Sequence, residues 1–419
     1  MRRQLTREQG LYLLANLIDN IGSGLWAPMA LIFFTRAQHL PIEQVGTALT
    51  AGGFIGLLAG PLGGNLVDRW GPTPFVVLGN VARAGVCALY PLVGSAWHVG
   101  LLTVVFTASE RVFWTANAPM LGRLVREGEL TRAFGLLGVF RLVGLGAGAG
   151  LGAALSGLLI DDVRGLRLVT YANAVSYLVA AALVLAVGQA VRGAAVTADH
   201  GDAAPPSGAG WRVLLADRPY LLLCLLQVQF TLATQSLVVI LPVVALDILH
   251  GPSWLPGVLV IVACGCLVLA REPALRYGER RSRTHSLRLS CLAFALAFLL
   301  LVPAAWLDVQ WAVPVALAAA VAGGVGEALY APVTIAMANE AAPEALKGRY
   351  SAVFQTAFGL AGALGPALFT GLLTAGNSVL WLALAGISLL SAPAVSRVTR
   401  ALPALPVLGT AQPVERKGA

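Results

Sequence analysis

Six ionisable residues lie inside long apolar segments of this 419-residue sequence: Asp19, Arg83, Glu110, Arg111, Arg141 and Glu327. A charged side chain at the centre of a lipid bilayer costs at least about 2.5 kcal/mol unless it is paired or hydrated. A low dielectric favours the protonated form of a carboxylic acid, whereas a nearby arginine favours the carboxylate. Carboxylates in such segments can therefore bind a proton near neutral pH and release it when their surroundings change.

Four of these residues are candidates for ion pairs between neighbouring helices: Asp19, Glu110, Arg111 and Arg141. Consecutive helical residues point about 100° apart, so Glu110 and Arg111 are not expected to face each other. We expect each of the two acidic residues to pair with one of the two arginines across helices. The acidic residues are the candidate proton carriers, and the arginines would modulate them. Purely structural ties between helices remain the alternative, as does a solvated helix-end position for Asp19.

Arg83 and Glu327 are not assigned to these pairs, and we expect each of them in a different environment. Arg83 lies close to the end of its apolar segment, so we expect its long side chain to reach the polar interface. Glu327 is set among glycines and alanines, and we expect it to line a cavity rather than to face lipid. Glu327 is therefore also a candidate for proton coupling.

The composition supplies helices of membrane length to position these residues. Hydrophobic residues make up 58% of the chain and charged residues 11%, which is outside the range of soluble globular proteins. A helix needs about 20 mostly apolar residues to cross a bilayer. We predict an all-α integral membrane protein with twelve such spans, at 11–35, 42–64, 74–94, 98–122, 134–160, 166–188, 219–246, 254–270, 288–307, 311–337, 350–374 and 377–396.

Positive charges indicate the orientation of these spans. With a cytoplasmic N-terminus, only Arg36, Arg164 and Arg167 of the 28 basic residues fall outside, three lie within spans, and the rest lie in cytoplasmic loops and tails. This distribution follows the positive-inside rule. We therefore expect a multi-pass protein of the inner (plasma) membrane with both termini in the cytoplasm. The net charge of +8 then requires no nucleic-acid partner.

A small, polar stretch around residues 188–210 divides the chain. We predict four regions: a six-helix bundle at 1–188, a cytoplasmic linker at 189–217, a second six-helix bundle at 218–397 and a flexible cytoplasmic tail at 398–419. The two bundles also repeat in sequence, because Glu110 precedes Arg132 by the same interval as Glu327 precedes Arg349. We therefore expect two pseudo-symmetric halves.

A charged loop between the second and third spans contains Gly64, Asp68, Arg69 and Gly71. The loop resembles the G-x-x-x-D-R-x-G signature between helices 2 and 3 of the major facilitator superfamily. The resemblance covers residues 10–397 and implies two six-helix repeats that rock around a midplane cavity, with this loop as a cytoplasmic gate. The chain departs from the family pattern directly after the motif, where Pro72-Thr73-Pro74 replaces the expected basic residues.

Two further features resemble family motifs. Arg111 is similar to the arginine that the family carries in its fourth helix. The fifth span has glycines at alternate positions from Gly144 to Gly152, similar to the G-x-x-x-G-P-x-x-G-G motif of the family's antiporters, but without its proline. The eleventh span keeps Gly362, Gly365 and Pro366. The resemblance therefore favours export by exchange over import.

The family's cavity is lined by helices 1, 4, 7 and 10, and aromatic and amide residues of these spans are the substrate candidates: Trp26, Trp114, Asn117, Gln227, Gln235 and Tyr330. Aromatic rings with few charges suit a bulky, largely apolar solute, although aromatic residues also serve in lipid contacts and core packing. Because Arg111 and Arg141 are positively charged, an anionic substrate remains an alternative.

Other classes of function lack their motifs. The sequence has no G-x-x-x-x-G-K-[ST] phosphate loop, so an ATP-driven pump is not expected. No catalytic residues, metal ligands or cofactors are expected, and the five cysteines lie in apolar segments away from histidines. We predict a monomer in the bilayer that exports a hydrophobic small molecule or drug, driven by the proton gradient. A symporter or uniporter importing a nutrient, and a non-transporting receptor or scaffold, are the alternatives.

Overall fold

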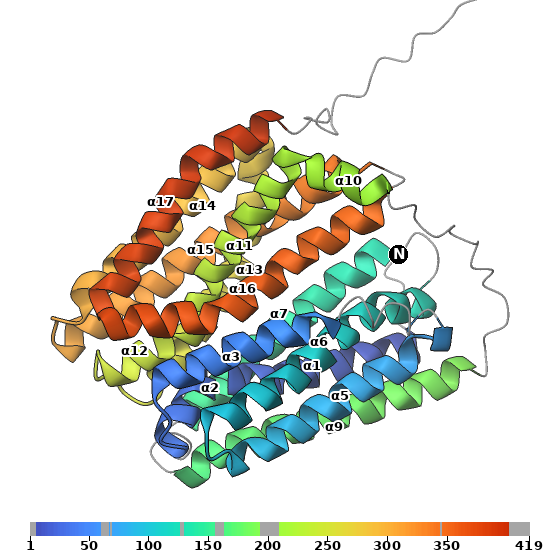
Figure 1. The fold of residues 1–419 in the computed structure, drawn as a ribbon, viewed down its shortest axis with the longest axis horizontal. Coiled ribbons are helices and arrows are strands. Elements are labelled where there is room, and N and C mark those ends of the chain that lie inside the picture. Colours follow the sequence, from blue (N-terminus) through green and yellow to red (C-terminus); the bar gives the residue numbers. More distant parts are fainter. Residues whose placement is uncertain are drawn as a thin grey trace, which may run out of the picture.

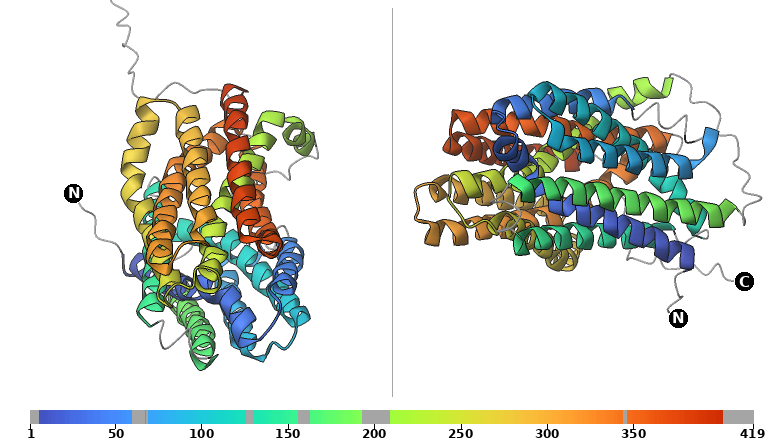
Figure 2. Two further views of the ribbon diagram at one scale, coloured as in Figure 1. Left: turned by 90° about the vertical axis from the view of Figure 1, so that its left-hand side faces the viewer. Right: turned by 90° about the horizontal axis from the view of Figure 1, so that it is seen from below.

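The computed structural model describes residues 6–59, 67, 69–125, 130–155, 163–192, 209–343 and 346–401. These residues are almost entirely helical and contain no strand. Figure 1 shows two groups of helices, the N-terminal half in blue to green and the C-terminal half in yellow-green to red. Seen end-on in the left view of Figure 2, the two halves lie one above the other.

The N-terminal half begins with a helix of mixed type, made of α1 (Arg7–Trp26), η1 (Ala27–Met29), α2 (Ala30–Ile32) and η2 (Phe33–Ala37). It continues with α3 (Ile42–Leu57), α5 (Pro72–Leu89), η3 (Tyr90–Leu92), α6 (Ala96–Leu124), α7 (Leu130–Ala154) and α9 (Val163–Arg192). Helix α1 begins at Arg7 because Thr6 and Gln9 form a capping box that satisfies free backbone N–H groups.

The C-terminal half begins with a short helix, α10 (Ala209–Ala216). The helices that follow are α11 (Arg218–Val239), α12 (Leu241–Asp247), α13 (Leu255–Arg280), α14 (Arg283–Ala304), α15 (Val309–Ala341), α16 (Lys347–Ala375) and α17 (Asn377–Ala401). Asp217 fixes the start of α11, since its carboxylate accepts a hydrogen bond from the Tyr220 backbone N–H at 3.1 Å.

Each of the twelve predicted spans overlaps a helix in the described residues, and the ends of two of them, 60–64 and 156–160, lie outside those residues. Ten of these helices are long and apolar enough to cross a membrane, and α3 and α6 occupy the other two predicted spans. The helix at the short predicted span 254–270 is longer than that span, since α13 continues to Arg280. The predicted linker has helix at both ends, and residues 193–208 within it lie outside the described part. Helix α17 extends to Ala401, into the predicted tail.

The helices of the two halves pack in the same order. In the N-terminal half α1 packs on α7 and α9, α5 on α6 and α9, and α3 on α6. In the C-terminal half α11 packs on α16 and α17, α14 on α15 and α17, and α13 on α15. The repeated order confirms the pseudo-symmetric all-α architecture predicted from the sequence.

The halves contact each other mainly through α3 with α16 and through α7 with α13. Because the helices alternate in direction, the start of α1 and the ends of α9 and α17 lie at one end of the molecule, here called the termini end. The opposite end is called the hairpin end. The Thr50 hydroxyl accepts a hydrogen bond from the Ala367 N–H at 2.9 Å, and Gly257 lies against Ala149 and Ala153. These cross-half contacts lie toward the hairpin end, from which the two sets of helices diverge in Figure 1.

An ion pair joins the halves at the hairpin end. Arg36, in the π-helical turn η2, bonds to Asp247 at the end of α12. The Arg36 and Asp247 side chains are 39% and 41% exposed, so the pair belongs to the weak class of surface salt bridges.

Neutralising Arg36 or Asp247 is therefore expected to favour opening of the hairpin end by about 0.2–1 kcal/mol, up to about a fivefold change in population. Labelling of single cysteines at the hairpin end by an impermeant maleimide measures that change. The charge exchange Arg36→Asp with Asp247→Arg should restore the wild-type labelling rate. Equal labelling in all variants would show that the pair does not contribute to closure.

Candidate functional site

Asp19 of α1 and Arg83 of α5 form a buried ion pair. Arg83 Nη2 lies 3.4 Å from Asp19 Oδ2, and each residue is only 5% exposed. Two sequence predictions are therefore wrong: Arg83 does not reach the interface, and Asp19 pairs with neither Arg111 nor Arg141. The reason is the helix face, because Arg83 follows Gly79 and Asn80 along the buried side of α5.

The Arg83 guanidinium is held by more than the carboxylate. Its Nη2 donates to Asn80 Oδ1, and its Nε donates to the Gly79 carbonyl at 3.3 Å. The guanidinium carbon lies 4.4 Å from the ring centroids of both Phe113 in α6 and Tyr177 in α9. The rings provide cation–π attraction on top of the ion pair. Four helices of the N-terminal half thus meet at this one side chain.

Asp19 has a second polar neighbour on its own helix. The Ser23 hydroxyl donates to Asp19 Oδ1 at 3.5 Å and lies 3.1 Å from the Tyr177 hydroxyl. The three side chains form a polar row from α1 to α9. The row fixes the orientation of the carboxylate opposite Arg83.

Glu110 and Arg111 pair with each other, contrary to the expectation that neighbours on a helix cannot meet. Arg111 Nη2 lies 3.3 Å from Glu110 Oε2. Their Cβ atoms diverge, but both side chains are long enough to bend back together. Arg111 also reaches toward Gly359 of α16, and its buried Nε has no hydrogen-bond partner in the part of the chain described. The pair therefore sits where the two halves meet.

Arg141 and Glu327 come from opposite halves. The Arg141 guanidinium lies 5.1 Å from the Trp114 ring centroid, and its charge acts on both Glu327 and Asp19. Glu327 lies in α15 of the C-terminal half. The three carboxylates and three arginines thus comprise two close pairs and one pair that interacts at longer range.

Two C-terminal substrate candidates, Gln227 and Tyr330, lie near each other on α11 and α15. Tyr330 stacks on Phe230 with ring centroids 4.5 Å apart, and its hydroxyl lies 3.4 Å from Thr234. Gln227 donates to Thr231 at 3.1 Å, while its buried Oε1 has no partner among the described residues.

Gln235 lies further along α11, where its amide faces Gly362 of α16.

The N-terminal candidates are more dispersed. Trp26 stacks on Tyr90 at 5.2 Å within an aromatic cluster near the hairpin end. Asn117 is buried in the other core cluster and accepts a hydrogen bond from the Tyr12 hydroxyl. Trp114 lies beneath Arg141. The structure brings Trp114 close to the charged residues but places Trp26 and Asn117 in packed cores.

The gating loop is only partly described. Gly64 and Asp68 lie outside the described residues, whereas Arg69 is exposed and Gly71 precedes α5. Gly71 has a φ of 80°, a left-handed conformation that favours glycine, and Pro72 begins the helix after it. The Arg123 guanidinium lies against Gly71. A gating role for the four residues stays a prediction.

The sequence predictions missed the contacts of Arg83. A signal for them exists, because Gly79, Asn80, Arg83, Ala84 and Cys87 recur at intervals of three and four, whereas large apolar residues fill the exposed face of α5. Small and polar residues with this spacing indicate a buried polar face rather than a snorkelling side chain.

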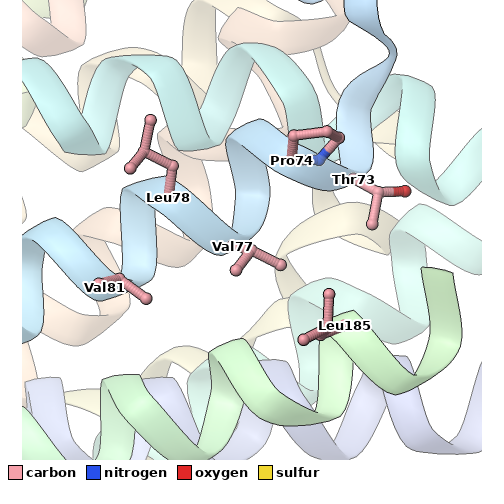
Figure 3. Close-up of a pocket in the computed structure, with 6 residues that line it drawn as sticks. All are labelled: Thr73, Pro74, Val77, Leu78, Val81 and Leu185. Carbon is pink, nitrogen blue, oxygen red and sulfur yellow. The ribbon is translucent and has the colours of Figure 1, made fainter. Parts of the chain in front are cut away.

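An apolar groove of about 320 Å³ lies elsewhere, on the outer side of α5 and α9 (Figure 3). Its lining residues are Thr73, Pro74, Val77, Leu78, Val81 and Leu185. The groove has no ionisable side chain, and Leu78 and Val81 are exposed there. Such a surface suits contact with lipid chains and does not belong to the charged site. Within the described residues no three His, Cys, Asp or Glu side chains are grouped to hold a metal ion.

Comparisons with known proteins agree with this architecture. A family model described as Major Facilitator Superfamily matches residues 12–319 and 273–415. The chain is 26% identical over 298 residues to the multidrug resistance protein MdtH of Citrobacter koseri and to that of Salmonella typhimurium, covering 70% of each chain.

Solved structures share the fold at low sequence identity. A mutant of the nucleoside transporter NupG superposes with a TM-score of 0.77 at 13% identity, covering 94% of this chain and all of that one. A POT family transporter in complex with 5-aminolevulinic acid gives 0.76 at 12% identity, covering 95% and 97%. A bacterial homologue of the lysosomal transporter Spinster, in an inward-facing conformation, gives 0.65 at 15%, covering 95% of both chains.

Proposed function

Because the chain belongs to the major facilitator superfamily, a family of transporters, we propose that it exports a hydrophobic small molecule or drug in exchange for protons. The observation that carries the proposal is the presence of two carboxylate–arginine pairs within the membrane-crossing helices, Asp19 with Arg83 and Glu110 with Arg111. Similarity to the multidrug resistance protein MdtH supports efflux as the direction.

The arrangement of the halves fits one stage of alternating access. The halves contact each other toward the hairpin end, and the positive charges favour a cytoplasmic termini end. With that orientation, in the inner membrane, the site opens toward the cytoplasm. Substrate would enter from the cytoplasm, and the halves would then rock to open the hairpin end.

Protons would drive the return of the halves. A carboxylate paired with arginine is held in its charged form, which suits a site that has released its proton to the cytoplasm. When the hairpin end opens, Asp19 or Glu110 would take up a proton from the outside, and the substrate would leave. Arg111 and Arg141 would modulate these two carriers, and Glu327 would respond to Arg141 across the halves. The protein would act as a monomer and need no cofactor.

The substrate side chains suit a bulky, largely apolar molecule. Trp114 is half-buried and offers an aromatic ring beside Arg141. The stacked rings of Tyr330 and Phe230 and the Gln227 Oε1 are buried in this conformation, so they would meet the substrate only after the surrounding helices move. Small-molecule sites are usually lined by apolar and aromatic side chains with a few polar groups that orient the ligand.

Everted membrane vesicles with an acid interior test the proposal. Addition of lipophilic drugs should release protons from the wild-type vesicles, followed with a pH-sensitive dye, and Glu110→Gln should lower that release by at least about tenfold. Glu272→Gln is the matched control, because Glu272 is 66% exposed and pairs with Arg276 one turn along α13. Vesicles that contain the protein but release no protons with any drug would favour import or facilitated diffusion.

A further inference from the structure

Arg83 has no evident need to be charged if it serves only in packing. A buried ion pair can be replaced by well-packed apolar residues at little or no loss of stability. Position 83 nevertheless carries a guanidinium that is 5% exposed and lies between two aromatic rings in the interior of the N-terminal half. Packing therefore does not explain the positive charge at position 83, and the charge itself is expected to have a function.

The contacts of Arg83 separate into two groups. One is the Asp19 carboxylate, at 3.4 Å, which is longer than the roughly 2.8 Å of a strong charge-assisted hydrogen bond. The other group comprises Asn80, the Gly79 carbonyl and the Phe113 and Tyr177 rings, none of which depends on the charge of Asp19. The guanidinium would therefore stay in place if Asp19 became neutral.

The second pair, Glu110 with Arg111, is partly exposed and lacks this property. Arg111 Nε has no partner among the described residues, and Glu110 and Arg111 are 34% and 25% exposed. Loss of charge on Glu110 would free Arg111, whereas loss of charge on Asp19 would leave Arg83 held. Asp19 is thus the carboxylate whose partner, Arg83, keeps its position whether Asp19 is protonated or deprotonated.

The titratable and charged groups that act on Asp19 come from every helix around it: Tyr12 of α1, Arg83 and Cys87 of α5, Glu110 of α6, Arg141 of α7 and Tyr177 of α9. Arg83 is the cation in contact with the carboxylate, since Arg141 acts only at longer range. The state of Asp19 therefore depends most directly on Arg83.

We propose that Arg83 is the positioning residue for proton exchange at Asp19. The inference rests on the proposed proton-coupled export. Arg83, in contact with Asp19, favours the deprotonated form of its carboxylate. Proton uptake forms one O–H bond on Asp19 and breaks the ion pair, while Arg83 keeps its charge and remains between the Phe113 and Tyr177 rings. Release of the same proton restores the pair.

The test compares the pH dependence of drug-induced proton release for Arg83→Gln, Arg83→Lys and the double variant Asp19→Asn with Arg83→Gln. Without the cation, Asp19 holds its proton more tightly and releases it only at higher pH. The profile of Arg83→Gln should therefore move upward by about one pH unit or more. Arg83→Lys keeps the positive charge but loses the planar guanidinium, so its pH profile should shift less than that of Arg83→Gln. The double variant should fold but lose the release that depends on Asp19.

The controls separate this inference from the proposed function. Arg276→Gln and Glu272→Gln remove an exposed pair of the same chemistry and should leave the profile unchanged. If Arg83→Gln does not accumulate as folded protein, Arg83→Lys and the double variant test the role of Arg83 instead. A wild-type profile in Arg83→Lys and wild-type release in the double variant would show that the pair is only structural. No release by the wild type would instead overturn the export proposal and the role of Arg83 with it.

Discussion

Replacement of Gly148 by leucine is expected to prevent stable folding of the N-terminal half, whereas the same replacement at Gly138 of the same helix should be tolerated. A Cβ atom at Gly148 would collide with the Ile21 carbonyl oxygen of α1 and lie 2.8 Å from the Leu25 nitrogen. Both obstacles are backbone atoms, which cannot turn aside. At Gly138 no atom lies within 4 Å of an added Cβ.

The expected loss for Gly148→Leu is at least about 3 kcal/mol, at the upper end for overpacked cores, because α1 and α7 would have to separate. Thermal unfolding of the purified protein in detergent measures the loss. Gly150→Ala is an informative third variant: its Cβ would lie 3.4 Å from the flexible end of Ile261, on α13 of the other half. It should unfold close to the wild type. Equal unfolding temperatures for the Gly148 and Gly138 variants would contradict the close contact of α1 and α7.

The glycines of α7 show what the sequence could and could not predict. Their density indicates close helix packing in a membrane. Positions two apart point about 200° from each other on a helix, so alternate glycines serve two opposite faces. Gly144 and Gly148 meet α1 within the half, whereas Gly146 and Gly150 meet α13 of the other half. The periodicity reveals two faces, but only the assembled fold says which partner each face meets.

The charged residues show the same limit. The sequence identified all six, because each ionisable residue in a long apolar segment stands out. It could not assign their partners, since a pair depends on helix rotation and on the neighbours of each helix. Distance from the helix end does not reveal that position 83 lies on the buried face of α5. The directions of the Cβ atoms do not reveal that the Glu110 and Arg111 side chains are long enough to meet.

The helices themselves were predictable because a membrane span needs only length and apolar composition. Each predicted span overlaps a helix in the described residues, although α13 ends ten residues beyond the prediction, at Arg280 rather than 270. The last turns of α13 contain Arg276 and Arg280, which lowered the local hydropathy without ending the helix. Hydropathy marks the apolar part of a helix and not its backbone limits.

Leucine at Gly257 is expected to act on the conformation of the whole protein rather than on the fold of one half. A Cβ atom at Gly257 of α13 would lie 2.7 Å from the Ala153 nitrogen and 2.8 Å from its Cβ, both on α7 of the other half. The obstruction lies across the interface that closes the hairpin end. Each half can keep its own packing if the two halves separate there, so the population should shift toward a conformation open at the hairpin end.

A cysteine introduced at Thr370 reports that shift, in a background without the five native cysteines. Thr370 is 1% exposed and faces Gly46 across the halves, so an impermeant maleimide should reach it only after separation. A bias of about 1.4 kcal/mol would raise the labelling rate about tenfold where the closed state dominates. Gly265→Leu is the control on the same helix, because no atom lies within 4 Å of its added Cβ. Faster labelling in the Gly257 variant alone would show that the α7–α13 contact holds the hairpin end closed. Equal labelling in both variants would show that closure does not depend on this contact.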